Sequence, residues 1–184
     1  AFLRDTLPVA RLFASRAALV VIFMLGLTGL FMASRQFDTF SHTFLYFFSL
    51  EGVAGYVLAL FFVKTFHEFG HTCMAKHFGC RVPTMGLAFL VLAPVLYTDV
   101  TDAWRLPSRR QRMLVSSAGI MVEIAIAAIA TFLWAFLPDG IVRSACFFVA
   151  TTSWVLSLAI NLSPLMRFVG YYLLGDYWRI SNLQ

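Results

Sequence analysis

Long apolar blocks dominate the pattern of hydrophobic and polar positions along this chain. Four blocks carry at most one Asp, Glu, Lys or Arg: Ala17–Ala33, Thr39–Val63, Met113–Leu137 and Ser144–Met166. A transmembrane helix needs about 20 predominantly apolar residues, with about 17 as the lower limit. A helix in a soluble bundle would keep a polar face, which these blocks lack. The pattern therefore predicts an all-α membrane protein with about four transmembrane helices.

Charge and glycine set the expected ends of these helices. We predict helices over residues 17–34, 52–77, 109–137 and 141–162, and a loop over residues 35–50. The second helix is expected to end before Gly79, because glycine commonly occupies the position just beyond a helix C-terminus. All of these elements belong to one predicted membrane domain, residues 1–184, whose abrupt ends indicate a piece of a longer chain.

One apolar stretch does not fit the helical pattern. Met85–Tyr97 is too short to span a bilayer, and Gly86 and Pro94 interrupt it. Short apolar runs of this kind form re-entrant segments in some membrane proteins. Irregular backbone survives at membrane depth only where protein or water satisfies its polar groups. We therefore expect a re-entrant or extended segment near residues 85–97, lining a cavity as a strand or hairpin.

Composition strengthens the membrane interpretation, and charge orients the chain. The chain is 60% hydrophobic and 12% charged, against about 45–50% and about 25% in soluble domains. The net charge is +5, and basic residues gather before the first span and between the second and third: Arg4, Arg11, Arg16, Lys76, Arg81, Arg105, Arg109, Arg110 and Arg112. Lys and Arg accumulate on the cytoplasmic side, so we expect the N-terminus and the 76–112 loop there. This orientation explains the arginines, and no nucleic-acid partner is expected.

An HExxH motif, His67-Glu68-Phe69-Gly70-His71, lies toward the expected cytoplasmic end of the second helix. Two histidines four residues apart lie on one helix face, so both imidazoles can bind one Zn²⁺. Glu68 is then the expected general base, which takes a proton from the attacking water. Ionisable residues within a membrane segment are costly and usually functional. The alternative is a helix end in the headgroup region, with both histidines merely interfacial.

Two further regions accompany the HExxH motif. One runs from Tyr97 through Gly119, and the other joins Asn161-Leu-Ser-Pro164 to Gly170-Tyr171-Tyr172. With them the chain resembles the site-2 protease family of intramembrane zinc metalloproteases, most closely the bacterial peptide zinc metalloproteases found with secretion components. The resemblance implies a multi-pass protein of the bacterial inner membrane, in which the Asn161 and Pro164 region positions the substrate. It also implies secretion or export components as partners.

The chain departs from the family at one decisive position. The family's second signature is Asn-x-x-Pro followed by Asp-Gly, and Val169 stands where the resemblance places the Asp, the third zinc ligand. Valine cannot bind zinc, and catalytic zinc sites normally use three protein ligands plus water. Three explanations are open: an inactive protease relative, a variant or engineered change, or another carboxylate that completes the site.

Asp99 and Asp102 are the candidates for such an alternative carboxylate. Both follow the expected re-entrant segment, which would bring their loop near the metal motif. The competing interpretation is that they belong to a turn and interact with the nearby arginines, since loop acids beside basic residues usually stay solvated.

Three functions therefore compete at this point. The first is an intramembrane zinc metalloendopeptidase that cleaves a peptide or transmembrane-helix substrate in or near the bilayer, with an irregular 85–97 segment that accepts the unwound strand. The second is a catalytically inactive membrane receptor or export-machinery partner, which Val169 favours. The third is a transporter that uses the motif as a relay, although the repeated halves common in transporters are not evident.

Overall fold

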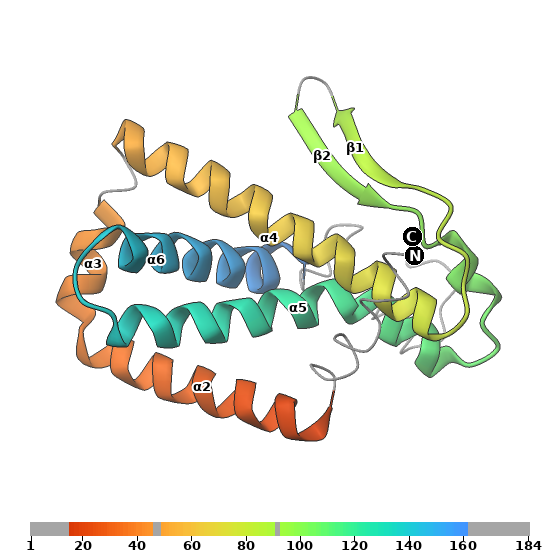
Figure 1. Ribbon diagram of the computed structural model, residues 1–184, viewed down its shortest axis with the longest axis horizontal. Coiled ribbons are helices and arrows are strands. Elements are labelled where there is room, and N and C mark those ends of the chain that lie inside the picture. The colour runs from red at the N-terminus through yellow and green to blue at the C-terminus, as the bar shows by residue number, and fades with distance from the viewer. Residues whose placement is uncertain (1–14, 46–48, 91–92, 162–184) are drawn as a thin grey trace. The chain divides into compact units, whose positions relative to one another are not determined.

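A computed structural model describes residues 15–45, 49–90 and 93–161 (Figure 1). Within these residues, α2 (Arg16–Arg35), α4 (Leu50–His77) and α5 (Arg109–Phe136) are long and apolar enough to cross a membrane. The shorter apolar α6 (Ile141–Trp154) continues into the π-helical η3 (Val155–Asn161). The predicted all-α membrane fold is confirmed. Residues 162–184, which include Pro164 and Val169, lie outside the described part.

Local chemistry fixes where these helices begin and end. The Ser15 side chain accepts a hydrogen bond from the Ala18 N–H at 3.2 Å and so caps the start of α2. At the end of α4, Gly79 takes a φ of +79°, a left-handed conformation that suits glycine. The N–H groups of Gly79 and Cys80 then bond to the Lys76 and Ala75 carbonyls at 3.0 and 2.9 Å. This is a Schellman motif, and the predicted end of the second helix before Gly79 is confirmed.

The loop expected over residues 35–50 is wrong in part, because α3 (Phe37–Leu45) is a helix. Asp38 lies in its first turn, where a negative charge is favourable. The Phe40 ring packs edge-on against Trp134 at 5.7 Å between ring centroids. Tertiary contact with an aromatic partner stabilises a helix too short to form alone, and hydropathy does not register that contact.

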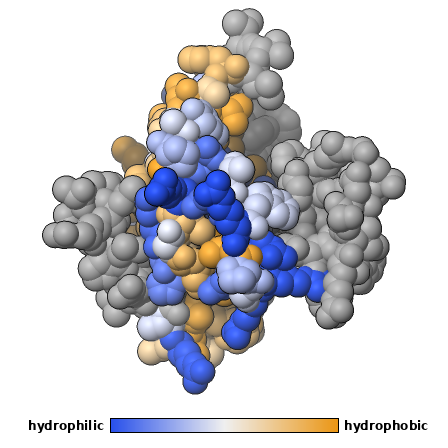
Figure 2. Space-filling model, turned by 90° about the vertical axis from the view of Figure 1, so that its right-hand side faces the viewer, coloured by the Kyte–Doolittle hydropathy of each residue, from blue (hydrophilic) through white to orange (hydrophobic). Residues whose placement is uncertain are grey.

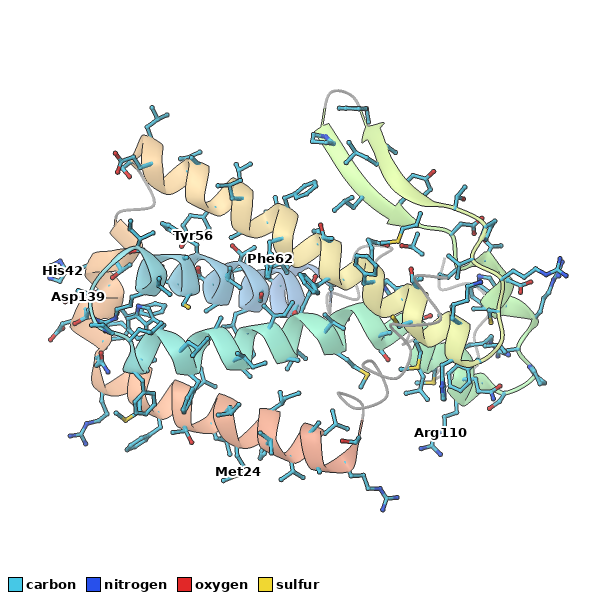
Figure 3. The ribbon with its side chains drawn as sticks, in the orientation of Figure 1. Met24, His42, Tyr56, Phe62, Arg110 and Asp139 are labelled. Atoms are coloured by element: carbon cyan, nitrogen blue, oxygen red, sulfur yellow. The ribbon has the colours of Figure 1, made fainter. Side chains whose placement is uncertain are left out.

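Residue contacts group the chain into two compact units, and α4 and α5 each contribute to both. One unit comprises Arg11–Val63 and Glu123–Leu156. Its buried core contains Ala59, Trp134, Ala135, Phe147 and Phe148. In Figure 3, Tyr56 lies toward α6, whose Thr151 contacts the Tyr56 hydroxyl at 3.1 Å.

Close approach of helices in this unit depends on glycine. A Cβ at Gly29 would lie 2.7 Å from the Phe132 backbone nitrogen, and one at Gly55 would lie 2.5 Å from the Phe148 ring. Small residues let membrane helices pack backbone to backbone, since the bilayer gives little hydrophobic drive for association. Other apolar side chains of α2 point outward, as Met24 does in Figure 3, where it is 54% exposed.

The described residues of the other unit contain the HExxH motif and lie within Lys64–Val122 and residues 157–161. Its described core is formed by Ala75, Cys80, Ala103 and Val115. Strands β1 (Met85–Leu90) and β2 (Ala93–Thr98) form an antiparallel hairpin with Met85 opposite Thr98 and Leu90 opposite Ala93 (Figure 1). The predicted extended segment near 85–97 is therefore confirmed, as a hairpin followed by the 3-10 helix η2 (Thr101–Arg105).

Strongly hydrophilic residues gather on the face of this unit that carries η2 and the start of α5 (Figure 2). Arg81, Arg105 and Arg110 are exposed in this part of the chain, and Figure 3 shows the Arg110 side chain extending away from α5. The hairpin contrasts with this face, because its Leu87, Phe89 and Val95 are exposed apolar side chains.

Candidate metal centre

His67 and His71 lie on one face of α4, one helical turn apart. Their Nε2 atoms are 3.0 Å apart, and their ring centroids are 4.7 Å apart. Because α4 is a regular helix through both positions, the spacing of four residues suffices to bring the two imidazoles together. His67 is buried at 5% exposure, so its ring is removed from bulk water.

A carbonyl of α5 sets the tautomer of His71. The His71 Nδ1 lies 2.8 Å from the Val115 carbonyl oxygen. A carbonyl only accepts, so Nδ1 carries the hydrogen, and in the neutral ring the lone pair is on Nε2. Metal-binding histidines commonly donate their other ring N–H to such an acceptor, which orients the ring. The Val115 carbonyl therefore favours the His71 tautomer in which Nε2 can accept a metal or a proton.

Gly119 of α5 leaves the space in front of both histidines open. A Cβ at this position would lie 2.5 Å from His67 Nε2 and 2.6 Å from His71 Nε2. Gly70, inside the motif, meets α5 in the same way, since its Cβ would lie 2.9 Å from the Ala118 carbonyl oxygen. The two glycines allow α4 and α5 to approach closely, and Gly119 forms a cradle that any side chain would fill.

These residues fit two ligands of a zinc ion. Two nitrogens at about 2.0–2.1 Å from a tetrahedral zinc lie about 3.3 Å apart, a few tenths of an ångström from the 3.0 Å between the Nε2 atoms. Across residues 15–45, 49–90 and 93–161, no group of three or more His, Cys, Asp or Glu side chains is placed to hold a metal. The described part therefore supplies a histidine pair and not a complete set of three protein ligands.

The backbone of Glu68 links the motif to the hairpin. Its carbonyl oxygen accepts hydrogen bonds from the Thr72 hydroxyl at 3.0 Å and the Thr98 hydroxyl at 3.4 Å. Thr72 is fully buried, and its hydroxyl also lies 3.8 Å from the Met85 sulfur. The first residue of β1, Met85, and the last residue of β2, Thr98, therefore both contact α4 close to Glu68.

Comparison with protein families gives one result that bears on this geometry. The family model described as peptidase family M50 matches residues 55–174, which is more than half of the chain. The chain belongs to peptidase family M50. This is the site-2 protease family, so the resemblance noted from the sequence is confirmed. Searches of curated proteins and of solved structures give no match.

The M50 match extends over the motif, the hairpin, Asn161 and the position of Val169. Membership of family M50 supports an intramembrane metalloprotease at the level of the family, and its members are generally zinc enzymes. Three helices long and apolar enough to cross a membrane agree with that assignment.

Neither Asp99 nor Asp102 forms a group with His67 and His71 that could hold a metal among the described residues. Asp99 Oδ1 accepts a hydrogen bond from the Thr101 N–H at 3.0 Å. Hydrogen bonds from the Thr101 side chain and backbone lower the pKa of Asp99 from its ordinary value of 3.8. Asp102 accepts a 2.8 Å bond from the Arg81 N–H and pairs with Arg105 at 3.1 Å. Asp99 thus accepts hydrogen bonds within the turn, and Asp102 accepts a hydrogen bond from Arg81 and forms an ion pair with Arg105.

Of the remaining predicted site residues, only Asn161 lies in the part of the chain that the structure describes. Asn161 is the last residue of η3 and is buried at 4% exposure, whereas Pro164 and Val169 lie outside the described residues. Gly119 and Val115 are site residues whose roles sequence reasoning missed. A glycine and a valine in an apolar helix carry no chemical signal, and only the packing of α5 on α4 shows what they do.

Proposed function

We propose that this chain is an intramembrane zinc metalloendopeptidase that hydrolyses peptide bonds in or near the bilayer. The observation that carries the proposal is the pair of the buried His67 and the partly buried His71, with Nε2 atoms 3.0 Å apart beneath Gly119. Two further features support it: Gly119 leaves the space in front of both Nε2 atoms without a side chain, and the Val115 carbonyl favours the His71 tautomer that metal-binding histidines use.

His67 and His71 are proposed to hold the zinc, and Glu68 is proposed to act as general base. The zinc, when bound, polarises the scissile carbonyl and lowers the pKa of the attacking water. Glu68 takes a proton from that water while its oxygen bonds to the carbonyl carbon. The C–N bond then breaks, and the proton passes from Glu68 to the leaving amine.

The hairpin is proposed to receive the substrate. A transmembrane helix hides its amides in internal hydrogen bonds, so it must unwind locally before a peptidase can cleave it. Strands β1 and β2 pair only with each other among the described residues, and an unwound segment can add to a free strand edge. By family resemblance, Asn161 and Pro164 position the same segment.

Val169 favours a second function for this chain. A family member without its third zinc ligand could serve as a catalytically inactive membrane receptor or a partner of export machinery. In that case the histidine pair would remain as a relic with weak metal affinity, because two histidines are fewer ligands than catalytic zinc sites use.

Zinc content and peptidase activity separate these functions. The purified chain in detergent is compared with Val169→Asp and with Val169→Asp combined with Glu68→Gln, using a mixture of fluorogenic peptides as the probe. We expect Val169→Asp to bind stoichiometric zinc and to cleave the peptides. The added Glu68→Gln change should keep the zinc and lower the rate about 10²- to 10⁴-fold, which is the range for loss of a general base.

The result for the unmodified chain then assigns its function. Zinc binding together with cleavage would establish an active peptidase whose third ligand is a residue other than Val169. If the unmodified chain neither binds zinc nor cleaves peptide and Val169→Asp does both, this chain is a catalytically inactive relative. If Val169→Asp bound zinc and yet cleaved no peptide, the peptidase proposal would be overturned.

A further inference from the structure

A pocket of about 440 Å³ lies at the base of the hairpin, between the end of β2 and η2. Backbone bonds fix its walls. The Asp99 N–H donates to the Thr84 carbonyl at 2.9 Å, which extends the pairing of the hairpin. The Thr101 N–H bonds to the Asp99 carboxylate at 3.0 Å and starts the turn into η2. These bonds hold the backbone on both sides of the pocket.

The lining of this pocket combines one carboxylate with two aromatic rings. Asp99, Tyr97 and Trp104 line it, and the two rings are 42% and 63% exposed. Asp102, three residues on, pairs with Arg105, whereas no ion pair joins Asp99 to any cation in the described part of the chain. An ionised carboxylate beside exposed aromatic faces is the surface that attracts an organic cation.

The pocket lies next to the catalytic motif. Thr98 is one of its lining residues, and the Thr98 hydroxyl is the group that donates to the Glu68 carbonyl at 3.4 Å. A peptide segment added to the hairpin edge advances about 3.3 Å per residue. A substrate paired with the hairpin would therefore pass the pocket within a few residues of the bond that it presents to Glu68.

We propose that the pocket formed by Tyr97, Asp99 and Trp104 binds a lysine or arginine side chain of the substrate. This proposal rests on the proposed peptidase function and narrows its substrate class. Transmembrane segments carry Lys and Arg preferentially at their cytoplasmic ends. The pocket selects membrane segments with a basic residue close to the unwound, cleaved stretch, and it sets the position of the cut relative to that residue.

A binding experiment tests the proposal without requiring cleavage. The probe is a fluorescein-labelled apolar peptide of Leu, Ala and Ser that carries a single Lys, compared with the same peptide carrying Gln. Anisotropy is measured with the full chain bearing Glu68→Gln in nanodiscs of phosphatidylcholine. We expect the Lys peptide to bind about fivefold to tenfold more tightly, the range for one partly exposed ion pair with a cation–π contact.

Three variants assign that preference to the pocket. Asp99→Asn and Trp104→Leu should each reduce the preference for Lys to less than about twofold. Trp104→Phe should retain most of it, because the ring face is kept. Asp38→Asn removes the same charge from α3, outside the pocket, and should leave the preference unchanged.

The outcomes distinguish this proposal from its rivals. Equal binding of both peptides, or a Lys preference that survives Asp99→Asn, would overturn it. Cleavage without Lys preference refutes this pocket and leaves the peptidase intact. If the Lys peptide is preferred but no variant cleaves peptide, the peptidase proposal is refuted and the proposal of a Lys-binding pocket stands.

Discussion

At the scale of single residues, the candidate metal centre depends on positions that carry no metal-binding chemistry. The spacing of His67 and His71 is a local property of α4 and follows from the sequence. The open space before them and the orientation of His71 come from Gly119 and the Val115 carbonyl of α5. Residues so far apart in sequence meet only when the helices pack, so sequence spacing cannot indicate them.

Replacement of Gly119 by alanine tests the cradle. The new Cβ would lie 2.5 Å from His67 Nε2 and 2.6 Å from His71 Nε2, so the rings must turn away from a common metal. We expect Gly119→Ala to lower zinc affinity at least about tenfold, by analogy with changes around metal ligands. Competition with a chromophoric chelator measures this, with Val169→Asp as the parent if the unmodified chain binds weakly.

Gly86→Ala is the matched control for this change. Its Cβ would meet only the Tyr97 ring, at an ordinary 3.8 Å, and zinc affinity should stay within about twofold of the parent. Equal affinity of Gly119→Ala and Gly86→Ala would show that Gly119 does not shape the metal site. Thermal unfolding of both variants separates loss of zinc from loss of the fold.

At the scale of elements, hydropathy located the long helices and left the short ones undetermined. α2, α4 and α5 begin and end within two residues of their predicted ranges, because an apolar run of bilayer length permits few other structures. α3 was missed, since it owes its place to Phe40 packing on Trp134. The hairpin was predicted as extended because Gly86 and Pro94 oppose a helix.

Proline substitution tests the hairpin as a substrate-binding edge. Successive N–H groups of a strand point to opposite sides. Of the consecutive residues Leu87 and Ala88, one therefore directs its N–H toward β2 and the other directs it outward, to the free edge. Proline at either position removes that N–H. We expect the change at the outer position to reduce cleavage about tenfold or more, with zinc content unchanged. Both are measured in an active parent chain.

Alanine at Leu87 is the control, because it shortens the side chain and keeps the backbone N–H. Its cleavage should exceed that of the proline variant at the outer position. Should both proline variants cleave at the parental rate with full zinc, substrate pairing along this strand edge would be excluded.

At the scale of the whole molecule, charge predicts how the chain sits in the membrane. Basic residues between the second and third spans include the exposed Arg81, Arg105 and Arg110. Lys and Arg near membrane spans accumulate on the cytoplasmic side. We therefore expect the η2 region to be cytoplasmic and the turn between α5 and α6 to face the opposite side.

Two exposed prolines provide a matched test of this orientation. Pro107→Cys and Pro138→Cys are introduced separately after Cys73, Cys80 and Cys146 are replaced by alanine. A membrane-impermeant maleimide should label position 107 only in inside-out vesicles and position 138 only in right-side-out vesicles. Labelling of both positions from one side would contradict the predicted topology.

The sequence by itself determined the membrane class, the long helices, the HExxH pair and the family. Each of these follows from local composition or from spacing within one helix, which physical chemistry ties closely to structure. Only the tertiary structure decided the local hydrogen bonds of Asp99 and Asp102 and the open space that Gly119 leaves before the two histidines. It also decided that Thr98, whose hydroxyl donates to the Glu68 carbonyl, lines the same pocket as Asp99, Tyr97 and Trp104. Those features arise where segments distant in sequence pack together, and burial and backbone hydrogen bonds select such packing.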